Sequence, residues 1–388
     1  MKFTHCLLCL LLALAGQSTI AQDQQFFQHT IDSKVFGESR TIKIWLPKRY
    51  YTDSTIQFST TIMLDAQSDE VWNLAKGIID YQVRSYTVVP MIVVGIVSPD
   101  RGKEFSPGNT ALQEHLRTEV FPLLQENYRI NDFKTLIGHS WGGAFVGHTL
   151  FGAQKDLFDA YLGISPSLDA NNDVIFQAAD SILSAKEALG KYFFFSAGDV
   201  GFEWEYDRDV RKMDSLLGAH SSRTLQWNSQ HYPGLDHFAA LAPGITQGLV
   251  NMSRMYWVDE KRLEEFAETD SLTMRKQIRD FYAEREKIFG FRYLSKPNSI
   301  RYFGDGFRDR GKLNVAVQIY QWGLEQDPDN LRLYIGMADT YDKLVNAPKA
   351  KAGFMKIQEL LEAQKSQLDA DFYQTFTKWS AERLAKYE

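Results

Sequence analysis

The stretch TLIGHSWGGAF, residues Thr135 to Phe145, combines three local signals. A β-prone run, Thr135 to Ile137, leads into the pentapeptide GHSWG at residues 138–142, and a segment compatible with a helix follows. Strand, sharp turn and helix in this order are typical of a nucleophile elbow, with Ser140 at the apex. A turn that lifts the serine hydroxyl clear of a sheet leaves little room for Cβ atoms, which explains the flanking glycines. The alternative is an ordinary strand-to-helix turn with a surface serine.

Apolar runs before and after this stretch predict the rest of a sheet. Continuous runs of β-branched and aromatic residues are typical of strands buried on both faces, and a spacing of roughly 30 to 40 residues is that of βαβ crossovers. We therefore predict an α/β fold with a mostly parallel, doubly wound sheet. The two earliest segments alternate instead and predict an antiparallel edge hairpin. The predicted strands are 27–31, 40–46, 60–64, 91–97, 135–137, 160–164, 192–196 and 224–227.

The first 21 residues have the pattern of a signal peptide. Lys2 precedes an apolar run from Cys6 to Ala15, and small residues end at Ala21, where we predict cleavage. The apolar run is too short for a stop-transfer helix, so no membrane span is expected. Both cysteines, Cys6 and Cys9, fall inside this segment. We expect a bacterial protein that is periplasmic or secreted, without disulfides.

Two domains are predicted after the signal peptide. Residues 22–257 form the α/β domain, and residues 258–388 change to charged, helical sequence. Near residues 297–364, small and aromatic residues recur with the spacing of tetratricopeptide (TPR) repeats. A TPR-like helical extension is the interpretation, with an unrelated helical bundle as the alternative. Repeats of this kind often form binding surfaces, so a peptide or protein partner is a hypothesis for this region.

Composition excludes several other function classes. The formal net charge of −6 argues against nucleic acid or an anionic membrane as the main partner. The sequence contains no H-E-x-x-H motif and no calcium loop of EF-hand spacing, and it has no cysteine after Cys9. We therefore expect no metal and no cofactor.

If Ser140 is a nucleophile, it needs a base that a third group holds in place. In folds with this elbow the order along the chain is serine, acid, histidine. His237 lies in a turn-rich loop after the last predicted strand, immediately before a helix-like segment, and is the predicted base. His231 is the alternative base or a substrate contact.

The acid is predicted less directly than the base. Asp199 follows the run FFFSAG at a strand end, which is the expected position, and we predict it as the acid. Glu203 and Glu205 in the same loop are alternatives, and a triad without an acid also stays open.

Two backbone N–H groups are expected to bind the oxyanion. The residue after the nucleophile, Trp141, supplies one, and the first βα turn supplies the other through Gln67, or otherwise Ala66. His139 and Trp204 are candidate substrate contacts, together with His231.

These motifs resemble the putative esterase family of α/β-hydrolases, which includes enterobactin and other siderophore esterases, feruloyl esterases and esterase D. The resemblance covers roughly residues 30–250 and is carried by RTIKIWLPKRY, IMLDAQ, GHSWGG, ISPSL, FSAGD and PGLDH. It implies an α/β-hydrolase with Ser140 as nucleophile, His237 as base, and the Trp141 and Gln67 amides as the oxyanion hole. The substrate would be a small ester.

Two features depart from the siderophore-type members. Leu168-Asp169-Ala170 follows the Ser-Pro-Ser motif where those members tend to have aromatic residues, and no basic residues for an anionic ligand can be placed. The hypothesis is therefore an exported serine carboxylic-ester hydrolase that works through an acyl-enzyme, with the substrate undefined. Acyl transfer to an alcohol on the same residues, or an inactive scaffold that binds through the repeats, are the alternatives.

Overall fold

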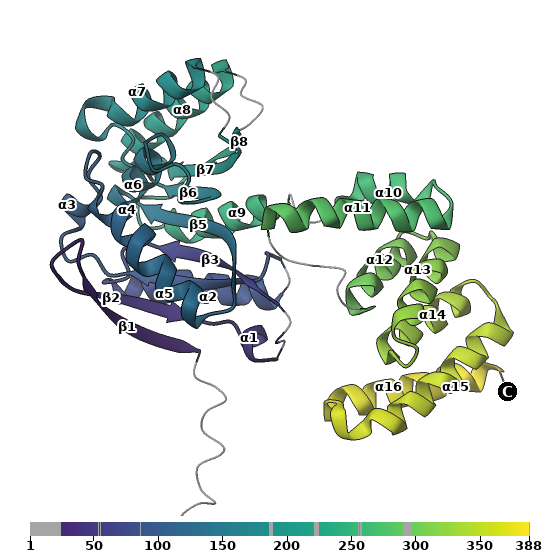
Figure 1. Ribbon diagram of the computed structural model, residues 1–388. Helices are drawn as coiled ribbons and strands as arrows, with labels where there is room; N and C mark the ends of the chain where they lie inside the picture. The colour runs from purple at the N-terminus through teal and green to yellow at the C-terminus, as the bar shows by residue number, and fades with distance from the viewer. Residues whose placement is uncertain are drawn as a thin grey trace, which may run out of the picture. The chain divides into compact units, whose positions relative to one another are not determined.

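The computed structural model of the 388-residue chain describes residues 25–52, 54, 56–85, 87–185, 189–220, 225–254, 256, 258–289 and 297–387. The predicted signal peptide, residues 1–21, lies outside these described residues. The chain divides into two compact units. Unit 1 comprises Met1–Tyr256 and Phe289–Phe291, and unit 2 comprises Trp257–Ile288 and Arg292–Glu388. Figure 1 shows the sheet in unit 1 and the helices of unit 2.

Unit 1 is built on an eight-stranded sheet of order β1-β2-β4-β3-β5-β6-β7-β8. β1 pairs antiparallel with β2, and β2 with β4, whereas all the other neighbours pair in parallel. The predicted edge hairpin and the predicted mostly parallel sheet are therefore confirmed. The strands are β1 Phe26–Ser33, β2 Glu38–Trp45, β3 Phe58–Met63, β4 Met91–Ile96, β5 Ile130–His139, β6 Ala160–Ile164, β7 Lys191–Gly198 and β8 Leu225–Tyr232.

Every connection between successive strands from β3 to β8 contains at least one helix (Figure 1). The helices of unit 1 are α1 Lys48–Thr52, α2 Asp69–Arg84, α3 Arg101–Glu104, α4 Ala111–His115, the π-helix η1 Leu116–Val120, α5 Phe121–Asn127, α6 Trp141–Leu150, α7 Ala170–Ser184, α8 Glu203–His220 and α9 Leu241–Arg254. The start of α7 is irregular, because Asn171, Asn172 and Asp173 all have positive φ.

Helices pack on both faces of the sheet because successive strand residues point to opposite sides. Gly248 of α9 lies against Leu162 of β6, where an added Cβ would come within 2.8 Å of the leucine side chain. The next residue, Gly163, lies against Pro166, and Pro166 also meets Gly143 of α6. The central strands β3 and β4 are buried along their whole length. This two-sided burial explains their unalternating apolar sequence.

Unit 2 is entirely helical among its described residues. Its helices are α10 Glu260–Ala267, α11 Ser271–Phe289 (whose last residue belongs to unit 1), α12 Pro297–Asp309, α13 Leu313–Gln326, α14 Leu331–Lys343, α15 Ala347–Gln364 and α16 Ala370–Leu384, with the short 3-10 helices η3 Lys365–Gln367 and η4 Ala385–Tyr387.

Small residues bring consecutive helices of unit 2 close together. Gly304 of α12 packs on the ring of Tyr320, where an added Cβ would lie 2.4 Å from the ring. Gly353 of α15 packs on Ala338 of α14 in a similar way, at 2.8 Å. Ala338 and Phe354 are fully buried in the core of this unit. The helical extension is therefore present, whereas its assignment as TPR-like stays a prediction.

Within the described part of the chain, every helix is too short or too polar to cross a lipid bilayer.

Candidate active site

Ser140 lies at a strained turn between β5 and α6. Its backbone has φ 58° and ψ −118°, a conformation that costs an L-residue of order 1–3 kcal/mol. Two glycines are required by space: a Cβ at Gly138 would lie 2.1 Å from the carbonyl oxygen of Gly142, and one at Gly143 would lie 2.5 Å from Pro166. The nearest atom to a Cβ at Gly142 would be a side-chain oxygen of Asp65, at 3.3 Å. Steric exclusion is therefore strict at Gly138 and Gly143 and mild at Gly142.

His237 is held by a buried carboxylate. Its Nδ1 lies 2.6 Å from Oε2 of Glu203, the first residue of α8, and the Glu203 side chain has no exposed surface. Because a carboxylate accepts, Nδ1 carries the proton in the neutral ring and Nε2 keeps its lone pair. This is the tautomer that a general base acting through Nε2 requires.

The second oxygen of Glu203 is fixed as well. Oε1 accepts a hydrogen bond from the Ser165 hydroxyl at 2.5 Å and one from the Gly198 N–H at 3.0 Å. Ser165 comes from the ISPSL motif at the end of β6 and has a positive φ of 43°. These two hydrogen bonds, from residues at the ends of β6 and β7, fix the position of the Glu203 carboxylate. The sequence analysis assigned no role to Ser165.

The carboxylate that contacts His237 is Glu203, one of the predicted alternatives, and not Asp199. Asp199 is exposed, and its Oδ1 accepts from the Gly234 N–H at 2.8 Å, so it stabilises the loop that leads to His237. Glu205, the other alternative, is also exposed. The carboxylate that reaches the imidazole is Glu203, because the first turn of α8 directs this side chain back under the loop and into the interior. Asp199 lies at the strand end but its carboxylate points to the neighbouring turn.

His139 links the loop of His237 to the turn at Ser140. Its Nε2–H donates to the backbone carbonyl of His237 at 2.8 Å, and the two imidazole rings have centroids 4.5 Å apart. Burial, followed by the proximity of His237, lowers the pKa of His139 to about 4. The neutral ring next to Ser140 is therefore a hydrogen-bond donor that positions the loop of His237.

The turn predicted to supply the second oxyanion donor is held tightly. Asp65 has φ 62°, and the Gln67 side chain ties this turn together by donating to Asp65 Oδ1 at 2.9 Å and accepting from the Ser98 N–H at 3.1 Å. The Ala66 N–H donates to the carbonyl of Ile96 at 3.0 Å. Ala66 is thus engaged in the sheet, which leaves Gln67 as the candidate donor beside Trp141.

Arg101 is a site residue that the sequence analysis missed. Its guanidinium binds Asp65 in a bidentate manner, with Nε 2.6 Å from Oδ1 and Nη2 2.9 Å from Oδ2. Nη2 also lies 3.4 Å from the carbonyl oxygen of His139. Arg101 therefore connects the turn at Asp65 to the turn at Ser140. The signal available in the sequence was its position two residues after Pro99, where the short helix α3 begins after the carboxyl end of β4.

The short helix α3, which begins at Arg101, is also held by an ion pair at its last residue. Glu104 of α3 is buried and accepts from the buried guanidinium of Arg40 in β2 at 2.6 Å. Burial opposes the charge of Arg40, but its hydrogen bonds to Glu104 and Glu38 prevail and raise its pKa. This ion pair fixes α3 and so helps to fix Arg101.

Aromatic rings surround the imidazole of His237. Tyr206 lies 4.5 Å from it by ring centroids, Phe202 5.2 Å, and Phe238 5.5 Å with an edge-on geometry. Trp204, predicted as a substrate contact, is exposed on α8 with the guanidinium of Arg208 5.7 Å from its ring.

His231 is not part of the Glu203–His237 pair. Its Nδ1 bonds Asp207 Oδ1 at 2.5 Å, and Asp207 also accepts from Arg211 at 2.7 Å. Burial would raise the pKa of Asp207, but these hydrogen bonds from Arg211 and His231 lower it. His231, the predicted alternative base, therefore belongs to a separate ion-pair network. Its carboxylate partner, Asp207, lies one helical turn after Glu203 on α8.

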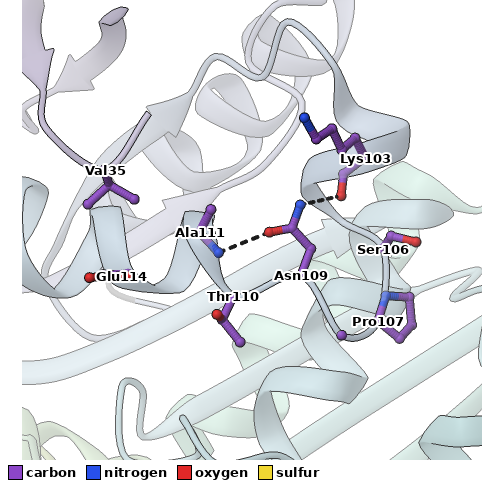
Figure 2. A pocket seen from close by; sticks show the side chains of 9 residues that line it. Val35, Lys103, Ser106, Pro107, Asn109, Thr110, Ala111 and Glu114 are labelled. Atoms are coloured by element: carbon purple, nitrogen blue, oxygen red, sulfur yellow. Dashed lines mark hydrogen bonds between the residues drawn. The ribbon is translucent and has the colours of Figure 1, made fainter. Parts of the chain in front are cut away.

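A polar hollow of about 650 Å³ opens elsewhere on unit 1 (Figure 2). In Figure 2, the Asn109 side chain donates to the Lys103 carbonyl and accepts from the Ala111 N–H, at 2.8 and 3.0 Å. Neither Ser140 nor His237 lines this hollow. In the described ranges, no three histidine, aspartate, glutamate or cysteine side chains gather closely enough to hold a metal ion.

Comparisons with known proteins agree with this fold. Residues 33–194 match the family described as Putative esterase. No curated protein sequence matches the chain. An IroE-like serine hydrolase from Shewanella oneidensis superposes with a TM-score of 0.61 at 16% identity, covering 77% of this chain and 99% of that one.

Two other solved structures have a similar fold. An uncharacterised protein from Capnocytophaga ochracea has a TM-score of 0.63 at 17% identity and covers 86% of this chain and 94% of its own. The siderophore hydrolase EstB from Aspergillus nidulans has a TM-score of 0.52 at 19% identity and covers 63% of this chain and all of its own, 100%. At these identities the structural likeness shows the fold, and the family match carries the activity. The chain thus resembles the putative esterase family over residues 33–194, which supports its assignment as a carboxylic ester hydrolase.

Proposed function

We propose that this protein hydrolyses a small-molecule ester through a Ser140–His237–Glu203 triad and an acyl-enzyme. The observation that carries the proposal is the buried Glu203–His237 pair, whose histidine is hydrogen-bonded through its carbonyl to the residue before Ser140. A strained serine between a strand and a helix, next to a histidine in a defined tautomer, is the arrangement that nucleophilic acyl transfer needs. The acid differs from the predicted Asp199.

The steps follow from the tautomer. Ser140 Oγ attacks the ester carbonyl while its proton passes to Nε2 of His237, and a tetrahedral oxyanion forms. When the intermediate collapses, the carbon–oxygen bond to the alcohol breaks and Nε2 returns the proton to that oxygen. Water then attacks the acyl-enzyme by the same route, which releases the acid and restores Ser140. Glu203 stays ionised and stabilises the imidazolium that forms in each half.

The oxyanion would be bound by the N–H groups of Trp141 and Gln67. Trp141 is the first residue of α6, where the N–H groups are not used by the helix and the helix dipole favours negative charge. Gln67 lies in the turn that Asp65 and Arg101 hold rigidly. Donors fixed before the reaction need no rearrangement as charge develops, and one such donor is commonly worth about 10²–10³ in rate.

Ser140→Ala provides the test. The purified variant should lose about 10⁴-fold or more of the wild-type hydrolysis of p-nitrophenyl acetate, because no other nucleophile is positioned at the elbow. A fluorophosphonate probe should label the wild type on Ser140 and leave the variant unlabelled. Ser215→Ala, on the exposed side of α8, is the control and should keep full activity. Undiminished activity of Ser140→Ala would exclude the proposed mechanism.

The substrate range requires its own measurement. EstB is named a siderophore hydrolase, so siderophore, feruloyl and acetyl-sugar esters should be compared on one preparation. Adding an alcohol acceptor to the same assay separates hydrolysis from acyl transfer through the products formed.

Export is part of the proposal. The charged start, short apolar run and small residues before Gln22 support a signal peptide that is removed to give a periplasmic or secreted protein. Mass spectrometry of the protein recovered from a bacterial periplasm should find a chain beginning at Gln22. Retention of residues 1–21 in the cytoplasm would contradict export.

A further inference from the structure

Two exposed phenylalanine rings lie beside the proposed base. Phe202 is 56% exposed and Phe238 is 74% exposed, yet both rings contact the imidazole of His237, at centroid distances of 5.2 and 5.5 Å. Phe238 also lies 6.4 Å from the ring of His139. Large apolar side chains grouped around a reactive residue and left open to water are typical of a surface that a ligand covers.

The chemistry of the proposed function assigns these rings to one side of the substrate. The imidazole returns its proton to the oxygen of the departing alcohol, so that oxygen has to come within hydrogen-bond distance of His237. Rings that contact the imidazole therefore flank the alcohol portion of the ester. The acyl carbonyl oxygen points instead toward the amides of Trp141 and Gln67.

The charges near the rings disfavour an anionic alcohol. Asp236 and Glu205 are exposed and adjoin this region in sequence, one residue before His237 and one before Tyr206. The nearby arginines on α8 are already paired, Arg208 with Asp209 at 3.0 Å and Arg211 with Asp207 at 2.7 Å. An incoming carboxylate or sulfonate would meet like charge and find these guanidinium groups engaged.

We infer that Phe202 and Phe238 form a subsite for the alcohol portion of the substrate, and that this portion is uncharged and apolar, with an aromatic or similarly flat group. This inference rests on the proposed hydrolase function and adds to it the chemical class of the leaving alcohol. Stacking or edge contacts between aromatic rings contribute about 0.5–1.5 kcal/mol beyond area burial, which gives a preference of about 2- to 12-fold per ring.

The experiment compares two substrate series on the full-length mature protein. In the first, acetate is constant and the alcohol changes from phenol to 2-naphthol to 4-hydroxybenzoate. In the second, phenol is constant and the acyl group changes from acetyl to butanoyl. The enzymes are wild type, Phe202→Ala, Phe238→Ala and the control Tyr81→Ala, which removes an exposed ring from α2 (68% exposed).

Wild type should prefer 2-naphthyl acetate over phenyl acetate, and 4-carboxyphenyl acetate should be the poorest of the first series. Phe202→Ala and Phe238→Ala should each lower the naphthyl-to-phenyl ratio of kcat/KM about 3- to 10-fold. Their butanoyl-to-acetyl ratio should stay at the wild-type value, and Tyr81→Ala should change neither ratio. Because both rings are exposed, thermal unfolding temperatures should also stay near wild type.

Several other results would contradict the inference. A change in the butanoyl-to-acetyl ratio with a constant naphthyl-to-phenyl ratio would place the rings on the acyl side, and no change in either ratio would exclude a subsite. A preference for 4-carboxyphenyl acetate would overturn the proposed charge preference. If Ser140→Ala were as active as wild type, the proposed function itself would fail, so the two failures can be told apart.

Discussion

Two histidine–carboxylate pairs use carboxylates of α8 that lie one helical turn apart, Glu203 and Asp207, and the pairs differ in burial. Glu203 and His237 have side chains 0% and 6% exposed, whereas Asp207 and His231 are 14% and 28% exposed. Asp207 is shared with Arg211, while Glu203 is shared with the Ser165 hydroxyl and the Gly198 amide. The first pair is surrounded by the ends of the parallel strands and the second belongs to a surface ion-pair network.

The difference shows that a short histidine–carboxylate bond is insufficient evidence for a catalytic role. Both pairs have the same chemistry and nearly equal distances, 2.6 and 2.5 Å. What distinguishes His237 is its contact with His139, the neighbour of Ser140. The function therefore depends on which pair is placed at the elbow, and the following substitutions test this distinction.

The largest effect is expected for Glu203→Gln. The glutamine amide would present N–H groups to Nδ1 of His237 and favour the wrong tautomer, which costs up to about 10⁴-fold in kcat in a comparable triad. We expect a loss of about 10²–10⁴-fold in kcat for p-nitrophenyl acetate. The matched variant Asp207→Asn should stay within about threefold of wild type. Equal losses in the two variants would remove the distinction between the pairs.

Arg101→Lys is expected to have an intermediate effect. Lysine keeps the positive charge but cannot bind both oxygens of Asp65, so the turn that carries Gln67 should lose its fixed position. We expect kcat to fall about 10- to 100-fold with little change in KM, because the donor acts mainly on the transition state. The exposed Lys103→Ala serves as control. A rise in KM alone would identify Arg101 as a substrate contact instead.

Stability should depend on pH through two buried histidines. Burial lowers the pKa of both His139 and His148 to about 4 from the ordinary value of 6.5. The unfolded chain therefore binds protons more readily than the folded chain between these values. Their contribution is fully present above about pH 6.5 and is lost as the pH falls toward 4, by about 1.4 kcal/mol per pH unit for each histidine.

Urea unfolding of wild type and His148→Leu between pH 7 and 4.5 measures this dependence. As the pH falls, the free energy of unfolding of the variant should decline less steeply than that of wild type. The difference should equal the contribution of one histidine. Identical slopes would show that the pKa of His148 is the same in the folded and the unfolded protein.

The smallest effect is expected for Asp199→Asn. The asparagine oxygen can still accept from the Gly234 N–H, and no contact joins Asp199 to the imidazole. Activity should stay within about twofold of wild type. A loss comparable to that of Glu203→Gln would restore Asp199 as the acid.

Sequence patterns were sufficient for the sheet, because each buried strand is a continuous apolar run that ends in polar residues. The positions of Ser140 and His237 were also predictable, since one lies in a motif and the other after the last strand, whereas their catalytic roles stay predictions. The side chain of Glu203 was harder to place, because its burial depends on how the first turn of α8 packs against β6 and β7. Asp199 was favoured because it follows a strand end. The direction of the side chains, which sequence patterns do not give, places Glu203 and not Asp199 against His237.

Arg101 and Ser165 could not be assigned from the sequence because their partners are distant along the chain. Asp65 lies 36 residues before Arg101, and Glu203 lies 38 residues after Ser165. In unit 2, helices were predictable from their spacing, but the role of the repeats, including a peptide partner, stays a prediction.

The location of Glu203 on a helix, with Phe202 just before it and Tyr206 one turn later, has a consequence for how this enzyme could change. A lengthened or shortened connection between Gly198 and Glu203 would displace Glu203 together with Phe202 and Tyr206. In the proposed mechanism, proton transfer and substrate preference would then change together, so that replacing ring side chains is the simpler route to a new specificity.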